Sequence, residues 1–192
     1  MKRIILVLLC AVMFMATSSA QKIKYGVKGG LNVSNLYGDS DETNSMAGIF
    51  IGGFMEYKTS KWAYGVDLLY SQKGAKSDST PLGATGSEVP KIHLNYISMI
   101  PTLKYYLSNN FNIQTGIQFG YNIEAETTYK GTSVDIKDVN DLDVGVILGG
   151  EYIFDMGLGL IGRYCAGVNP VIDDESEDVF NGTLQFGVSY RF

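Results

Sequence analysis

Polar and apolar residues alternate with a period of two over much of this chain, and no other feature constrains its fold as strongly. Between residues 112 and 124, every odd position carries Ile, Thr, Phe or Tyr, and every even position carries Asn, Gln, Gly or Glu. Successive side chains of a β-strand point to opposite faces, whereas a helix would need a period of about 3.6. The pattern therefore predicts a strand with one polar and one apolar face.

The same alternation recurs elsewhere and predicts eight strands in all. They cover approximately residues 22–33, 46–57, 62–71, 93–107, 112–124, 141–154, 158–166 and 180–192. The segments 58–61, 108–110 and 155–157 are tight turns, and the segments 34–45, 74–92, 126–140 and 167–179 are long and polar. Turns at one end and long loops at the other predict one antiparallel meander without a domain boundary. Pro101 interrupts the fourth strand, and we expect a bulge or a local break there because proline has no amide hydrogen.

The first 20 residues resemble an export signal. Lys2 and Arg3 precede an apolar run of about 13 residues, which is shorter than the roughly 20 that a membrane-spanning helix needs, and small residues follow up to Ala20. We expect cleavage between Ala20 and Gln21, so that residues 1–20 are a signal peptide and residues 21–192 form the barrel domain. Cys165 is then the single cysteine of the mature chain, which excludes an intramolecular disulfide and makes it a small packing residue.

Alternation alone fits both a soluble barrel with an apolar inside and a membrane barrel with an apolar outside. Aromatic residues favour the membrane barrel, because they gather in two belts where amphipathic rings would lie at the depth of the lipid headgroups. The belt at the tight-turn ends contains Tyr25, Tyr57, Trp62, Tyr64, Tyr105, Phe111, Tyr152, Phe154, Tyr190 and the terminal Phe192. A sparser set at the long-loop ends contains Tyr70, Tyr96, Tyr121, Tyr164 and Phe180.

Charged residues of both signs share the polar rows. They are Lys28, Asp67, Lys104, Glu124, Asp143, Glu151, Arg163 and Arg191. Such a mixture suits a narrow lumen filled by internal ion pairs, and the alternative is the solvated outer face of a soluble barrel. Eight strands leave room only for side chains, so an open pore is not expected. We therefore predict an all-β protein: an eight-stranded antiparallel up-and-down transmembrane β-barrel with both termini in the periplasm and four long loops outside the cell.

Four segments resemble the outer-membrane β-barrel family common in Bacteroidetes, the PorT-like or porin-family barrels. They are 26–36, 52–76, 94–122 and 182–192, with the stretches Leu-Tyr-Ser-Gln-Lys-Gly at 69–74 and Pro-Thr-Leu-Lys-Tyr-Tyr at 101–106 as the most recognisable parts. The resemblance implies a location in the outer membrane. It also implies insertion by the barrel-assembly machinery, for which Phe192 resembles the recognition signal.

The function expected from these observations is that of a small non-enzymatic barrel. Its role would be structural, or it would bind a surface partner through the long loops, in contact with outer-membrane lipid and lipopolysaccharide. The alternatives are an accessory of a secretion complex, as the name of the PorT-like family suggests, a narrow transport channel, or a lipid-modifying acyltransferase. No cofactor is expected. A net charge of −5 without clusters of Lys or Arg argues against a nucleic-acid partner.

Two motifs suggest enzyme or nucleotide chemistry. Gly157, Gly159 and Gly162 satisfy the G-x-G-x-x-G spacing, but a strand and not a helix is predicted after them, so a hairpin turn is the simpler interpretation. His93, the single histidine, could combine with Ser98 or Ser71 and with Asp67 as a base, nucleophile and acid. No G-x-S-x-G elbow accompanies this set, and a surface histidine is the simpler interpretation.

Acidic residues gather in two of the long loops and could bind Ca²⁺ or bridge to lipopolysaccharide through divalent ions. They are Asp39, Asp41, Glu42, Asp173, Asp174, Glu175, Glu177 and Asp178. Their spacing lacks the register of a calcium-binding loop, and solvated loops are the simpler interpretation.

Overall fold

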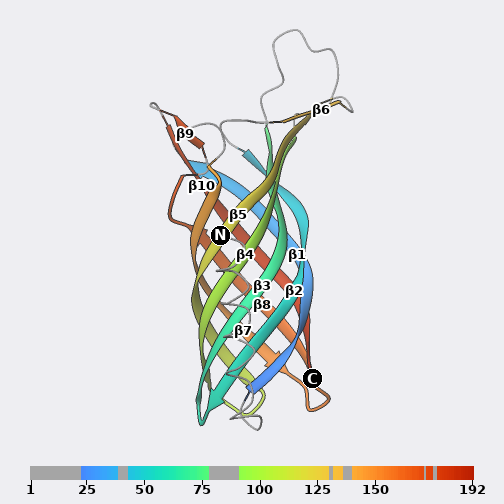
Figure 1. The fold of residues 1–192 in the computed structure, drawn as a ribbon, viewed down its shortest axis with the longest axis vertical. Coiled ribbons are helices and arrows are strands. Elements are labelled where there is room, and N and C mark those ends of the chain that lie inside the picture. The colour runs from blue at the N-terminus through green and yellow to red at the C-terminus, as the bar shows by residue number, and fades with distance from the viewer. Residues whose placement is uncertain are drawn as a thin grey trace, which may run out of the picture.

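The chain forms a closed antiparallel β-barrel (Figure 1). The structure is a computed structural model that describes residues 23–38, 43–77, 91–129, 132–135, 140–170, 172–174 and 177–192. Eight strands build the wall: β1 (Ile23–Gly38), β2 (Thr43–Thr59), β3 (Trp62–Ser77), β4 (Lys91–Tyr106), β5 (Phe111–Tyr129), β7 (Leu142–Ile153), β8 (Leu158–Gly167) and β10 (Glu177–Arg191). Two short strands, β6 (Thr132–Asp135) and β9 (Ile172–Asp174), pair with β5 and β10.

Each wall strand pairs with its neighbour in the sequence of wall strands, and β1 pairs with β10 to close the barrel. The closing pair runs from Gly26 opposite Arg191 to Gly38 opposite Val179. Closure removes the unpaired edges that an open sheet would expose. The predicted eight-stranded antiparallel barrel is confirmed. In the part of the chain that the structure describes, no helix is long and apolar enough to cross a membrane.

The tight turns and the C-terminus lie at the same end of the barrel (Figure 1). The backbone amide of Phe192 donates a hydrogen bond to the carbonyl of Tyr25 at 2.9 Å, which holds the C-terminus beside the start of β1. Gly157 has a φ of 87°, a left-handed conformation that glycine adopts without strain, and its amide closes the turn onto the carbonyl of Phe154. Because β8 follows this turn directly, the G-x-G-x-x-G spacing belongs to a hairpin.

Most wall strands are longer than the alternation predicted, whereas β7 begins and ends one residue inside the predicted bounds. For example, β3 extends to Ser77 rather than to residue 71, and β1 extends to Gly38 rather than to residue 33. At these ends the outward residues become polar, so the binary pattern fades while the backbone ladder continues. At Pro101 the ladder to β5 is interrupted at residues 100 and 101 and resumes in the same register, so the proline causes a local break without a bulge.

Inward-facing residues are buried and outward-facing residues are exposed along each wall strand, as β7 and β8 show most regularly. The lumen is not purely polar. A central group of buried apolar side chains lies among the charges: Phe50, Leu69, Ile100, Ile147 and Cys165. A second group, Ala75, Leu94 and Tyr96, lies toward the long-loop end. The core of the molecule is therefore the filled lumen.

Candidate functional site

The residues predicted for the belt at the tight-turn end lie on the outward face. Nine of the ten have exposed side chains, and Tyr105 is half-buried. Several rings contact one another: Trp62 and Tyr105 meet edge to face with their centroids 4.8 Å apart, and the ring of Phe192 lies 5.7 Å from that of Tyr25. Offset and edge-to-face contacts of this kind stabilise aromatic pairs. The outer surface thus carries a continuous aromatic rim at this end.

The second belt needs one correction. Tyr121 and Tyr164 are exposed on the outward face, and Tyr37, which the sequence analysis did not include, stacks on Phe180 with centroids 6.0 Å apart. Tyr96, however, is fully buried in the lumen. It shares the even positions of β4 with Ser98, so the pleat turns it inward.

The two belts enclose an outward surface of exposed aliphatic side chains. On β5 this surface runs from Phe111 to Tyr121, which matches the roughly 9–11 residues that a tilted strand needs to cross a bilayer. The strand continues to Tyr129. The barrel is therefore taller than a membrane requires, and the excess lies at the end of the long loops.

The lower lumen, next to the tight turns, holds a buried network around Lys104. Its Nζ lies 2.9 Å from Glu56 Oε2 and 2.8 Å from Glu151 Oε2, so a single cation bridges two carboxylates. Each carboxylate has a further donor: the Tyr106 hydroxyl donates to Glu56 at 2.7 Å, and the Ser189 hydroxyl donates to Glu151 at 2.8 Å. Charged groups this deeply buried require such partners, and here both acids have several.

Arg191 extends this network to the mouth of the barrel. Its Nη2 lies 3.4 Å from the Glu56 carboxylate and donates to the Tyr106 hydroxyl at 3.2 Å. The side chain is 14% exposed, whereas those of Glu56 and Lys104 are almost inaccessible. Arg191 therefore connects the buried charges with the surface at the tight-turn end.

At mid-height a carboxylate joins two cations. Asp67 Oδ2 lies 2.8 Å from Lys28 Nζ and 2.8 Å from Arg163 Nη1. Asp67 is on β3 and Arg163 is on β8, and four steps around the wall separate these strands in either direction. Arg163 also donates from Nε to the Gln185 side chain at 2.6 Å, and Gln185 donates to Asn32 at 2.8 Å. The ion pair thus crosses the full width of the lumen.

In the upper lumen, the described residues form one ion pair. Lys73 Nζ lies 2.6 Å from Asp143 Oδ2, and Gln118 donates to the same oxygen at 2.8 Å. Several buried polar atoms at this level, among them the hydroxyls of Tyr96 and Ser98, have no hydrogen-bond partner among the protein atoms. The lower lumen also has such atoms, on Asn112, Gln114 and Arg191, so the two levels differ in the number of charged groups that meet and not in the presence of unpartnered atoms.

Seven of the eight charged residues predicted for the lumen lie there: Lys28, Asp67, Lys104, Asp143, Glu151, Arg163 and Arg191. Glu124 does not. A shift of register between Asn95 and Tyr96 adds one residue to β5, so that Glu124 pairs with the outward-facing Asn95 and accepts a hydrogen bond from it at 2.6 Å. A single extra residue exchanges the two faces of a strand, which explains why Glu124 is exposed.

Two network residues, Glu56 and Lys73, were missed by the sequence analysis. Glu56 lies between the outward-facing Met55 and Tyr57, so its parity marks it as inward. Lys73 continues the inward row of Asp67 and Ser71 two residues beyond the predicted end of the strand. The alternation therefore indicated that Glu56 and Lys73 both face the lumen.

The candidate catalytic set is not assembled. Ser98, Ser71 and Asp67 are buried in the lumen, whereas His93 lies in an odd, outward-facing position of β4 and pairs with Gly74 and Glu126. A histidine on the opposite face of the wall cannot act as the base for these serines. Cys165 is a free, buried thiol within the central apolar group.

Several predicted residues fall where the structure gives no side-chain description. Ala20, Gln21, Asp39, Asp41, Glu42 and Glu175 lie outside the described residues. For Asp173, Asp174, Glu177 and Asp178 only the strand backbone is described. Among the side chains that are described, no group of three or more His, Cys, Asp or Glu residues is placed to hold a metal ion.

Comparison with known proteins agrees with this architecture. A family model described as "Outer membrane protein beta-barrel domain" matches residues 17–173. No curated protein matches the chain in sequence at a significant level. Among solved structures, Ail of Yersinia pestis, the attachment invasion locus protein, is similar in fold, with a TM-score of 0.57 at 14% identity over 90% of this chain and 100% of that one.

Neisserial surface protein A, NspA, is similar as well, with a TM-score of 0.59 at 15% identity over 88% of this chain and 97% of that one. At these identities the likeness concerns the fold. The family match extends over most of the chain, and the closed wall, the aliphatic band and the aromatic belts agree with it. The chain belongs to the outer membrane protein beta-barrel domain family and is an integral protein of the outer membrane.

Proposed function

We propose that this protein is a non-enzymatic outer-membrane barrel that acts at the cell surface and does not carry solutes through its lumen. The observation that carries the proposal is the Asp67–Arg163 ion pair. It joins opposite sides of the wall at 2.8 Å, and both side chains are at most 2% exposed. With Lys28 and Gln185 bonded to the same pair, the lumen is filled at mid-height.

The part of the barrel beyond the upper belt supports a surface role. There the outward face becomes polar, with His93, Asn95 and Glu124 where aliphatic side chains stand lower down. A polar outer face is compatible with water or carbohydrate and not with lipid tails. The paired strands would therefore lift the long loops above the membrane, and long loops commonly carry interactions.

Planar-bilayer recording tests the filled lumen. We expect the purified wild-type barrel to give no steady current. The double variant Asp67→Ala/Arg163→Ala removes the crossing pair, leaves Lys28 as a single charge at that level, and should conduct measurably. Glu124→Gln, which lies on the outer face, is the matched control and should stay silent. A steady current from the wild type would exclude the proposal and favour a narrow channel.

A complementation experiment tests the surface role. A deletion strain would receive either the whole protein or a barrel in which short turns replace the long loops. We expect both to insert, and only the whole protein to restore adhesion or resistance of the envelope to detergent. If the shortened barrel restores both properties fully, the wall alone is functional and the role is structural.

A secretion accessory is the second candidate. The two stretches on which the resemblance to PorT-like barrels rests contribute Lys73, Lys104 and Tyr106 to the lumen network. Loss of specific secreted proteins in the deletion strain, with an intact envelope, would favour this role over a free-standing surface protein.

A further inference from the structure

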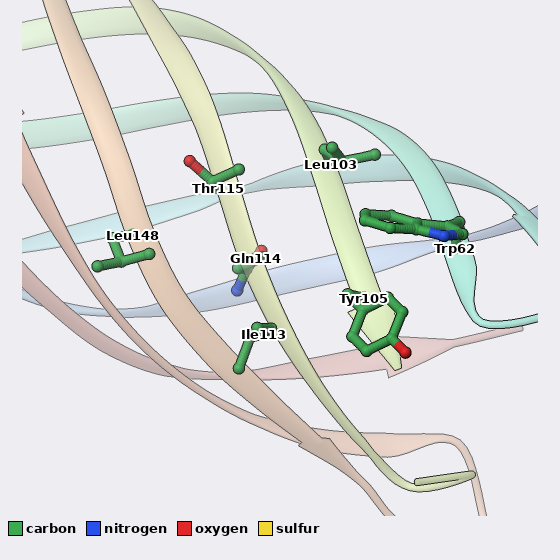
Figure 2. A pocket seen from close by; sticks show the side chains of 7 residues that line it. All are labelled: Trp62, Leu103, Tyr105, Ile113, Gln114, Thr115 and Leu148. Atoms are coloured by element: carbon green, nitrogen blue, oxygen red, sulfur yellow. The ribbon is translucent and has the colours of Figure 1, made fainter. Parts of the chain in front are cut away.

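A shallow apolar groove lies on the outward face near the tight-turn end (Figure 2). It has a volume of about 500 Å³ and is lined by Trp62 of β3, Leu103 and Tyr105 of β4, Ile113, Gln114 and Thr115 of β5, and Leu148 of β7; the Gln114 side chain is buried on the lumen side. This volume falls within the roughly 300–1,000 Å³ of small-molecule sites. A smaller depression of about 220 Å³ lies beside Met55 and Gly65, so the groove is the larger of these two hollows in the surface that faces lipid.

Small residues on β5 and β7 create the depression. Thr115 pairs with Leu148, and its hydroxyl donates to the backbone carbonyl of Ile147 at 2.9 Å, so this polar group is satisfied within the wall. Ile113 pairs with Gly150, which has no side chain. The floor of the groove is therefore low and apolar, between the higher side chains of Leu103 and Leu148. An extended hydrocarbon chain suits such a floor because the chain has no groups that need hydrogen-bond partners.

The groove begins at the aromatic rim. Trp62, Tyr105 and Ile113 pair across β3, β4 and β5 and form the row of the groove nearer the tight turns, and Leu103, Thr115 and Leu148 form the next row. Figure 2 shows the rings of Trp62 and Tyr105 at one side of the groove and Leu148 at the other. Because aromatic rims mark the depth of lipid headgroups, the groove extends from headgroup depth toward the centre of the bilayer. A lipid acyl chain follows the same path.

The charge of the neighbouring turn favours one type of headgroup. Lys61 immediately precedes Trp62, is exposed, and accepts a hydrogen bond through its carbonyl from the amide of Tyr106, so it is fixed beside the strand that carries Tyr105. The other two tight turns differ: 107–110 has no charged residue, and 154–157 carries Asp155. The turn on the Trp62 side of the groove is therefore the basic one, whereas the turn after β7, on the Leu148 side, carries Asp155.

We propose that this groove binds one acyl chain of a phospholipid from the leaflet at the tight-turn end, with an anionic headgroup held at Lys61. The apolar floor supplies affinity for the chain, and the lysine supplies preference for a net negative charge. A basic residue near the surface of an anionic membrane contributes enough for a severalfold preference.

Native mass spectrometry of the purified full-length barrel tests the site. The protein would be released from detergent in the presence of phosphatidylglycerol, which is anionic, or phosphatidylethanolamine, which is zwitterionic. We expect the wild type to retain one lipid and to prefer phosphatidylglycerol. Lys61→Gln should lower that preference by about fivefold, as expected for the loss of one cation at a membrane surface. Thr115→Phe, which fills the floor, should lower retention of both lipids.

Matched controls distinguish lipid binding in the groove from nonspecific lipid binding. Val188→Phe enlarges an equally lipid-facing residue on β10, and Lys24→Gln removes another exposed lysine at the same end. Both should behave as the wild type. Unchanged retention in Thr115→Phe, unchanged preference in Lys61→Gln, or an equal loss of preference in Lys24→Gln would each overturn the proposal. If Thr115→Phe does not fold, as judged by heat-modifiable migration on gels, Thr115→Leu takes its place under the same criteria.

Discussion

The lower and upper halves of the lumen differ in how they bury charged side chains. In the lower half, Lys104 bridges Glu56 and Glu151, and each acid accepts further hydrogen bonds. In the upper half, the described residues form a single ion pair, Lys73 with Asp143, and the carboxylate has one further donor, Gln118. Yet the strands of both halves have the same alternation of polar and apolar residues. The number of partners of a buried charged side chain thus depends on how many strands bring polar groups to it. The binary pattern does not specify that number.

The largest expected effect comes from removing the cation of the lower network. Lys104→Met leaves two buried carboxylates without their shared partner, and such a loss typically costs about 3–5 kcal/mol of unfolding free energy. Urea unfolding in lipid vesicles can be followed through Trp62, which is the single tryptophan of the chain and lies on the outer rim. Lys24→Met, which removes an exposed lysine at the same end of the barrel, is the control. A cost below about 1 kcal/mol would mean that water reaches the lower lumen and replaces Lys104.

A smaller effect is expected in the upper half. Lys73→Met leaves a single carboxylate, Asp143, which keeps its hydrogen bond from Gln118. We expect a loss of about 2–3 kcal/mol in the same measurement. If this variant is less stable than Lys104→Met, the comparison between the two halves is reversed, and the number of partners does not determine the cost.

The smallest changes in unfolding free energy are expected from the removal of two tyrosine hydroxyls, one in each half of the lumen. Tyr106→Phe removes a donor to the buried Glu56 carboxylate and should cost about 1.5 kcal/mol, because hydrogen bonds to charged groups are the stronger ones. Tyr96→Phe removes a buried hydroxyl whose nearest partner among the described residues is the uncharged side chain of Asn122, and it should cost much less than Tyr106→Phe. Equal costs for the two variants would show that Tyr96 has a further partner in solution, such as an ordered water molecule.

Most of the fold could be predicted from the sequence because alternation and turn lengths act locally. Strand number and antiparallel order follow from the alternation and the turns, and the outward position of Trp62 or Tyr190 follows once the aromatic belts identify the apolar face as the outer one. The upper ends of the strands could not be predicted, since the outward residues there are polar and the two faces look alike.

The placement of most single residues in the lumen could be predicted from the sequence, but the contacts between them could not. Parity places Asp67 and Arg163 in the lumen, yet nothing local shows that they meet across it. Glu124 was misplaced because a bulge one residue long has no sequence signature in this strand. The buried Phe50 and Leu69 were not anticipated as part of a central core, since apolar residues were expected mainly to face lipid.

The pairing of β1 with β10 also has a consequence for the order of folding. Each other contact in the wall joins strands that follow one another along the chain, so those hairpins can form early and at little entropic cost. The seam joins residues 26 and 191, the two extremes of the described chain, and it can close only when the last strand is in place. Until then β1 keeps a free row of amides and carbonyls, and a nascent barrel of this kind needs that edge shielded for as long as its final strand is missing.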